Sequence, residues 1–189
     1  MIKMLKRKLL PLTSMVFVLG LSGLLSQAGT VQAAYGNDGV VTIPKQMRGV
    51  WYSYDRDAHN GRKLIFTAHS FNGKPVYSQK SSIVSDYFNG KVKKQQAFDQ
   101  VTKNWMSGKT TKLKGDVFYE IDPWISFENW SLYQVVFQII NGKKHYILIY
   151  SSRYDGGNYC RYDGGNYYRS KKLAKKMKNY KFAKVNYTM

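Results

Sequence analysis

The sequence has little of the chemistry on which catalytic and metal sites depend. Its 189 residues include one cysteine and three histidines, against 16 tyrosines. A single cysteine excludes an intramolecular disulfide, so stability must come from an ordinary hydrophobic core. His59, His69 and His145 show no paired spacing of the kind that zinc sites use. We therefore expect no metal and no cofactor.

Catalytic motifs are equally scarce. No serine lies in a G-x-S-x-G segment, and no serine, histidine and acid form a recognisable set. A glycoside hydrolase needs two carboxylates across a cleft, and Glu120 with Glu128 would supply them, with Asp116 and Asp122 nearby. Acidic residues near strand ends that pair with surplus lysines explain the same positions without catalysis. We predict that the protein is not an enzyme.

Negative charge is the third shortage, with 11 acidic residues against 30 lysines and arginines. Such an excess draws a protein to polyanions through an attraction that salt screens. Outside a bacterial cell the candidates are wall teichoic acids, anionic lipid headgroups, acidic polysaccharides and DNA, and charge alone does not choose among them. The alternative interpretation is that the lysines only keep a small protein soluble.

Residues 1–33 have the order of a secretory signal peptide: basic residues, an apolar run, and Val31-Gln32-Ala33, which places small side chains where a signal peptidase needs them. The apolar run 9–25 contains proline, glycine, serine and threonine and is short for a membrane span. We expect cleavage after Ala33, a short flexible lead at 34–42 and a single β-rich domain at 43–189. The mature form then has no integral membrane span and is secreted, extracellular or loosely associated with the cell wall.

Alternating polar and apolar residues around Trp51 and Leu64, with Asn72-Gly73 between later runs, predict strands joined by hairpins. The apolar runs 135–140 and 146–150 flank Asn141-Gly142, which predicts a hairpin of central strands covered on both faces. The segment 93–106 fits either a helix or a twisted strand.

Near the C-terminus, Ser170 is a suitable cap for a short helix on which Leu173 and Met177 share a face, and 182–187 reads as a final strand. The fold class we predict is mainly β: a single antiparallel barrel or sandwich of about eight strands, with a short C-terminal helix and a final strand.

Two segments carry a resemblance to a known group. The chain reads IPKQMRGVWY at 43–52 and YYRSKKLAK at 167–175. It thereby resembles the small, basic, tyrosine-rich secreted proteins of lactic acid bacteria, a group that implies no particular activity.

Gly49-Val50-Trp51 also resembles the G-x-W motif on the first strand of lipocalins and other calycin barrels. That resemblance implies a barrel whose end is closed by Trp51 beneath a basic residue, Arg153 or Arg169. The late T-D-Y segment of that family is missing, since Ser85-Asp86-Tyr87 comes too early, and 93–106 has no place in an up-and-down meander.

The C-terminal third combines aromatic rings with cations, which suits stacking on sugars or bases and contacts to phosphate. The alternative is that the tyrosines pack a β core. The predicted polyanion-binding residues are Arg169, Lys171, Lys172, Lys175, Lys176 and Lys178. The predicted aromatic rim comprises Tyr154, Tyr159, Tyr162, Tyr167 and Tyr168.

An octapeptide is written twice, as RYDGGNYC at 153–160 and RYDGGNYY at 161–168. Two copies are too few for a repeat architecture, and Asp-Gly-Gly-Asn is turn chemistry. Eight residues preserve the in-out alternation of a strand, so we interpret the duplication as the extension of a hairpin. It takes the form of a small meander, with turns at 155–157 and 163–165, or of a tyrosine-rich loop. An exposed Cys160 would be able to link two molecules through a disulfide.

Two functions remain. The first is a secreted, non-enzymatic basic β protein that associates electrostatically with an anionic cell-wall polymer or another polyanion. The second is a lipocalin-like barrel that binds a small apolar ligand.

Overall fold

The computed structural model describes residues 35–54, 61–113, 115–126, 129–156, 159–185 and 187, with only the backbone at 129, 153–156 and 159–163. In this part of the chain the structure is mainly β, as predicted. The strands are β1 (Asn37–Val40), β2 (Gly49–Ser53), β3 (Arg62–Phe66), β4 (Ser70–Phe71), β5 (Lys74–Gln79), β6 (Met106–Leu113), β7 (Asp116–Pro123), β8 (Asn129–Ile140), β9 (Lys143–Gly156) and β10 (Tyr159–Tyr168). The helices are the 3-10 turn η1 (Lys45–Met47) and the α-helices α2 (Ile83–Phe88), α3 (Gln95–Thr102) and α4 (Lys171–Met177).

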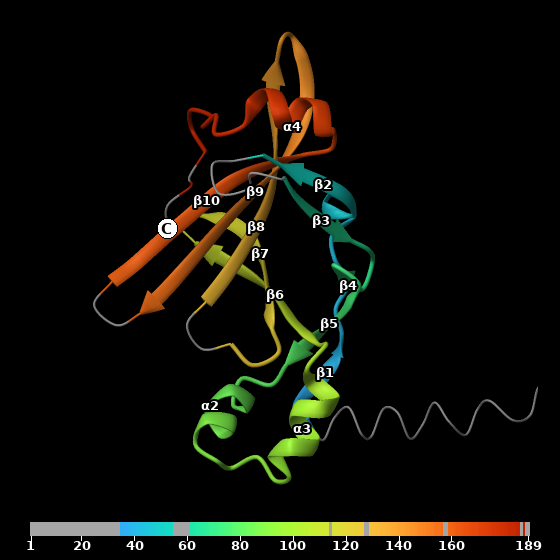
Figure 1. The fold of residues 1–189 in the computed structure, drawn as a ribbon, viewed down its shortest axis with the longest axis vertical. Coiled ribbons are helices and arrows are strands. Elements are labelled where there is room, and N and C mark those ends of the chain that lie inside the picture. Colours follow the sequence, from blue (N-terminus) through green and yellow to red (C-terminus); the bar gives the residue numbers. More distant parts are fainter. Residues whose placement is uncertain are drawn as a thin grey trace, which may run out of the picture.

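The strands form one sheet that closes into a ring (Figure 1). Their order is β1-β5-β4-β3-β2-β10-β9-β8-β7-β6, and β5 also pairs with β6. The sheet therefore has ten strands rather than about eight. The pairing of β5 with β6 is parallel, with Val76 opposite Met106, while the other pairings are antiparallel. A parallel pairing needs a long crossover connection, and residues 80–105, with α2 and α3, provide it.

Strand alternation sorts the apolar side chains into a cluster inside the ring and a second cluster on its outer face. Trp51 belongs to the first, and its neighbour Tyr52 to the second. The inner cluster consists of Ile43, Met47, Trp51, Phe66, Phe71, Val76, Met106, Tyr119, Ile121, Tyr133, Leu148 and Tyr167. The outer cluster lies beneath α4 and contains Ile140, Ile147, Ile149, Tyr168, Ala174 and Phe182.

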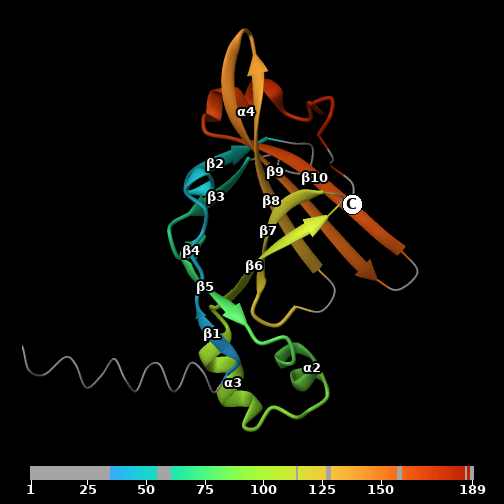
Figure 2. The ribbon, with the colours of Figure 1, turned by 180° about the vertical axis from the view of Figure 1, so that it is seen from behind.

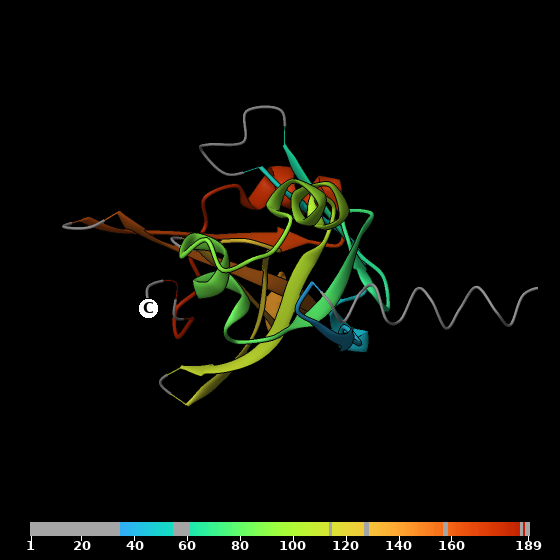
Figure 3. The same ribbon diagram turned by 90° about the horizontal axis from the view of Figure 1, so that it is seen from below.

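The α-helices of the described residues lie at the two ends of the elongated molecule (Figures 1 and 2). Figure 3 views it from the end that carries α2 and α3. In the segment 93–106, for which helix and strand were both open, residues 95–102 form α3 and Met106 begins β6. Phe98 and Thr102 are the buried residues of α3. The predicted C-terminal helix is confirmed as α4, and the hydroxyl of Ser170 accepts a hydrogen bond from the amide of Leu173.

Turn chemistry predicts the hairpins correctly. Asn72-Gly73 and Asn141-Gly142 all have positive φ, as a two-residue hairpin turn requires. The hairpin of β8 and β9 extends beyond the body of the sheet, however, and our prediction that both its faces are covered is wrong toward the turn. Phe137, Ile139 and Tyr146 are more than half exposed there, while Ile140 and Ile147 on the other face pack beneath α4.

Two predictions at the ends of the domain are wrong. We expected a flexible lead at 34–42, but Asn37–Val40 forms β1 because β5 offers it a strand to pair with. The side chain of Asn37 is buried and accepts a hydrogen bond from the amide of Gly39. We also expected a final strand at 182–187. Of that segment, 182–185 and 187 are described and form no strand, since Phe182 and Tyr187 dock by their side chains instead.

The octapeptide duplication lengthens the hairpin of β9 and β10, as the sequence predicts, although neither a meander nor a loop results. The register pairs Asp163 with Ser152 and Gly165 with Tyr150. The second Asp-Gly-Gly segment is therefore strand rather than turn. β9 ends at Gly156 and β10 begins at Tyr159, both inside the first copy.

Candidate functional site

Arg169 and Trp51 join two segments that lie far apart in the sequence, residues 43–52 and 167–175. Arg169 follows β10, and its guanidinium carbon lies 3.6 Å from the centre of the Trp51 ring. The same guanidinium donates a hydrogen bond of 2.8 Å to the carbonyl of Gln46. Burial lowers the pKa of Arg169 below its ordinary value, and an arginine still stays charged at neutral pH. Arg153, the other candidate for this position, lies outside the described side chains.

The backbone around Trp51 is shaped for this contact. Its indole N–H donates to the carbonyl of Met47 at 2.6 Å. Gly49 has a φ of +105°, and a Cβ at that position would lie 2.6 Å from the Arg169 guanidinium. Glycine is required there both by the backbone angle and by the space that Arg169 occupies.

The basic residues of α4 form an exposed surface, which we call the lysine helix. All five lysines predicted to bind polyanions are exposed: Lys171, Lys172, Lys175, Lys176 and Lys178. Within the described part of the chain none of the five makes an ion pair. The ammonium groups of Lys171 and Lys175 lie 5.4 and 5.3 Å from the ring centres of Tyr52 and Tyr54. Ala174 is buried, and Leu173 and Met177 pack against the outer cluster.

The predicted aromatic rim is not one surface. Tyr167 is buried inside the ring of strands, where its aromatic side chain meets that of Tyr150 edge to face. Tyr168 is buried in the outer cluster, and burial raises its pKa well above the ordinary value. These two tyrosines therefore pack the core rather than a rim. The side chains of Tyr154, Tyr159, Tyr162 and Cys160 lie outside the described residues.

The second copy of the octapeptide holds the C-terminal segment to the sheet. The side-chain amide of Asn166 donates to the carbonyl of Tyr180 at 2.5 Å and accepts from the hydroxyl of Tyr187 at 2.8 Å. That hydroxyl also accepts a hydrogen bond from the amide of Phe182. Gly164 allows the C-terminal segment to approach β10 closely, because a Cβ at this position would lie 2.9 Å from the carbonyl oxygen of Tyr187.

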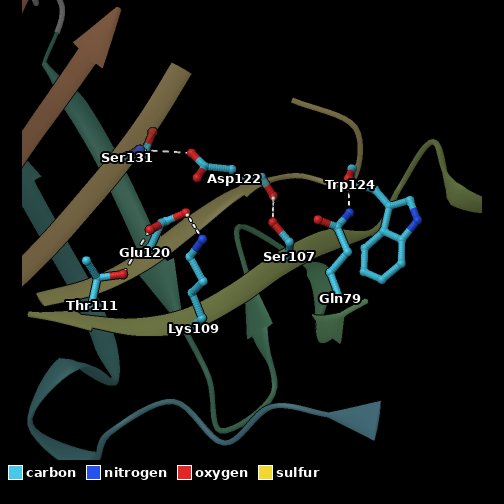
Figure 4. Close-up of polar contacts among 8 residues, drawn as sticks. All are labelled: Gln79, Ser107, Lys109, Thr111, Glu120, Asp122, Trp124 and Ser131. Carbon is cyan, nitrogen blue, oxygen red and sulfur yellow. Dashed lines mark hydrogen bonds and ion pairs between the residues drawn. The ribbon is translucent and has the colours of Figure 1, made fainter. Parts of the chain in front are cut away.

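A cavity of about 370 Å³ lies where α2 faces β5, β6 and β7. Two of the carboxylates considered in the sequence line it, Glu120 and Asp122, which alternate with inward-facing residues on β7. Glu120 accepts from the ammonium of Lys109 at 2.9 Å and from the hydroxyl of Thr111 at 3.0 Å (Figure 4). Glu128, its expected partner across a cleft, lies outside the described residues.

Asp122 differs from Glu120 in its environment. It is 4% exposed, and one carboxylate oxygen accepts a hydrogen bond of 2.8 Å from the amide of Ser131. Burial, with Glu120 nearby, raises the pKa of Asp122 to about 7 against the pull of Ser131 and Lys109. The sequence signal for this pair was the spacing Glu-x-Asp in a strand, which puts both side chains on one face. Sequence reasoning missed Lys109 and Trp130 as members of this site.

The remaining candidates do not assemble into a centre. The Nδ1 atom of His69 lies 3.0 Å from the carbonyl oxygen of Val41, and His145 lies opposite Gln138 in the β8–β9 hairpin. Among the described residues there is no group of three or more histidine, cysteine or acidic side chains able to hold a metal ion. The helices described here include none with the length and apolar character to cross a membrane.

Comparisons with protein-family models, with curated proteins and with solved structures find no match to this chain.

Proposed function

We propose that this protein is a secreted, non-enzymatic β protein that binds the anionic polymers of a bacterial cell wall through the lysine helix. The observation that carries the proposal is the state of the five lysines. They are exposed, four of them lie on one short helix and Lys178 directly follows it, and no ion pair among the described residues neutralises them. Unpaired cations on a fixed element attract a polyanion over several ångströms at moderate salt.

The helix is anchored at its start and along its inner side, so the lysines are presented as a fixed array. Arg169 on Trp51 and the cap at Ser170 fix the start. Ala174 is buried against the sheet. A fixed array has less backbone freedom to lose on binding than a flexible basic tail.

The orientation of the helix favours a charged polymer over a lipid bilayer. An interfacial helix needs an apolar face that is free to enter the membrane. Leu173, Ala174 and Met177 are the apolar residues of α4, and all three pack against the outer cluster. The face left to solvent is cationic, which supports electrostatic adsorption without insertion.

The alternative, an apolar ligand inside the ring, has less support. Phe66 and Phe71 come from β3 and β4, and Tyr133 comes from β8 on the opposite side of the ring. Their ring centres are 5.5 and 5.6 Å from that of Tyr133. Side chains from opposite walls therefore touch across the interior, where a ligand would have to lie.

The test is binding of the purified protein to isolated cell walls. We expect retention at low salt and release by roughly 0.5 M salt, where the screening length has fallen to a few ångströms. Removal of teichoic acid from the walls should abolish the retention. The double variant Lys172→Gln, Lys176→Gln should elute at a clearly lower salt concentration.

A matched control removes the same charge elsewhere. Lys91 and Lys93 are exposed residues between α2 and α3, at the other end of the molecule from α4 (Figure 1). Lys91→Gln with Lys93→Gln should elute close to the unmodified protein. Equal shifts in elution for the two double variants would mean that binding depends on net charge alone and not on the lysine helix. Retention that salt leaves unchanged would contradict the proposal.

A further inference from the structure

The cavity beside α2 is polar, in contrast to the apolar clusters of the rest of the molecule. Its walls carry hydroxyl groups from Ser78, Ser81 and Ser107 together with the carboxylates of Glu120 and Asp122. Its volume of about 370 Å³ is within the range of small-molecule sites. A lining of this kind disfavours an apolar ligand, because buried polar groups would lose water without gaining partners.

The charged groups of the cavity are held in fixed positions. Glu120 is 13% exposed and is bound at one oxygen by Lys109 and at the other by Thr111. Each carboxylate oxygen has two lone pairs, so Glu120 retains acceptor capacity toward the cavity. Lys109 has three N–H donors, and it is largely exposed. The site therefore offers acceptors and donors side by side.

An aromatic ring lies at the border of the cavity. Trp130, on β8, lines it and is 42% exposed. A flat aromatic face next to fixed hydrogen-bonding groups matches a ligand with an apolar face and a polar edge. Val84 of α2 adds a further apolar contact to the lining.

We propose that this cavity is a binding site for a neutral saccharide. The hydroxyl groups of a sugar ring donate to Glu120 and Asp122 and accept from Lys109 and the serines. The C–H face of the ring packs on Trp130. A charged polymer fits less well, because the Glu120 carboxylate opposes an anion and the ammonium of Lys109 is already paired with it.

This site is separate from the lysine helix, and it has a different dependence on salt. Binding to a polyanion weakens steeply as salt rises, whereas hydrogen bonds and packing to a neutral sugar do not. The proposed function and the saccharide site can therefore fail or succeed independently. A sugar that binds equally at low and high salt occupies the cavity rather than the helix.

The experiment is calorimetric titration of the purified protein with glucose, galactose, mannose, N-acetylglucosamine and chitobiose. Each titration is done in low salt and in about 0.5 M salt, where the screening length is only a few ångströms. We expect saturable binding of at least one of these sugars, unchanged by salt. Glu120→Gln should raise the Kd about tenfold, because the loss of a hydrogen bond to a charged group changes the Kd by about that factor. Trp130→Ala should weaken it by a similar factor, and Trp130→Phe by less.

Asp116→Asn is the matched control, because Asp116 is an exposed acid at the start of the same strand and does not line the cavity. It should bind as the unmodified protein does. Circular dichroism establishes that each variant is folded before titration. The proposal is overturned if none of the five sugars binds at millimolar concentration, or if Glu120→Gln and Trp130→Ala bind as tightly as Asp116→Asn.

Discussion

The guanidinium of Arg169 stacks on Trp51 at 3.6 Å, and this contact fastens the last strand of the ring and the start of α4 to the first strand after η1. Tyr168 lies opposite Tyr52 in the pairing of β10 with β2, one residue away on each strand. Two segments that lie far apart in the sequence are thus held together by the Arg169 guanidinium over the Trp51 ring and by its hydrogen bond to the backbone carbonyl of Gln46.

Arg169→Ala should lower the free energy of unfolding by about 1 to 3 kcal/mol, because the stacking and the hydrogen bond are both lost. Arg169→Lys should recover only part of it, since an ammonium lacks the planar stacking surface. Urea denaturation followed by tryptophan fluorescence measures the loss. If Ala and Lys at this position are equally stable and match the unmodified protein, the contact contributes nothing to the fold.

The contact between Trp51 and Arg169 was anticipated in part from the sequence, through the G-x-W motif at Gly49-Val50-Trp51. Trp51 and a late arginine were expected to meet, with Arg153 and Arg169 both open. The chain alone does not choose between them, because the choice depends on where β10 ends relative to β2. That register is set by the whole ring and by the octapeptide in the hairpin before it.

The turns and the helix cap, which depend on neighbouring residues, were predicted correctly from the sequence. The pairing of strands that lie far apart in the sequence was not predicted. Asn141-Gly142 and Ser170 act through their own neighbours, so the sequence predicts the turn and the cap. β1 depends on the free edge of β5, and the parallel pairing of β5 with β6 depends on the segment between them. The sequence placed Glu120 among the candidate carboxylates, but Lys109 and Trp130 join it only through the pairing of β6, β7 and β8.

Deletion of residues 153–160 should leave a folded protein, because the eight residues come from the far end of the β9–β10 hairpin. The pairing of Ser152 with Asp163 is retained, and Arg161-Tyr162 becomes a two-residue turn. Arg and Tyr resist the positive φ that such a turn needs. We expect a lower melting temperature, which Arg161→Asn with Tyr162→Gly in the shortened chain restores.

The readout that separates this register from a slipped one is Asn166. If the register holds, Asn166→Ala in the shortened chain costs as much as it does in the full one, about 1 to 3 kcal/mol for the loss of a buried partner of Tyr180 and Tyr187. Should Asn166→Ala have no effect there, the single Asp-Gly-Gly-Asn has become the turn, and the strand pairing has shifted.

The signal peptide expected at residues 1–33 leads to a further prediction. Expression in a secreting bacterial host should release a protein whose first residue is Ala34, as the side chains of Val31 and Ala33 indicate. Mass spectrometry of the released protein tests this. Changing Ala33 to a bulky residue such as Phe should leave the precursor uncleaved. Retention of the uncleaved wild-type chain in the membrane fraction would favour an anchor instead.

Asp122 gives the molecule a dependence of stability on pH. Burial raises its pKa from about 3.8 to about 7, so the folded protein holds this proton more tightly than the unfolded chain does. The stabilisation from Asp122 is therefore complete below about pH 4 and declines as the pH rises toward 7. Its slope is at most about 1.4 kcal/mol per pH unit.

Other carboxylates titrate over the same range, so the comparison is made against Asp122→Asn, which cannot titrate. The free energy of unfolding of the unmodified protein, relative to that of this variant, should fall between pH 4 and pH 7 and then level off. Urea titrations at half-unit pH intervals measure it, with Asp116→Asn as the exposed control that should keep the slope. Parallel pH curves for the unmodified protein and Asp122→Asn would mean that the carboxyl of Asp122 ionises in the folded protein as readily as in the unfolded chain.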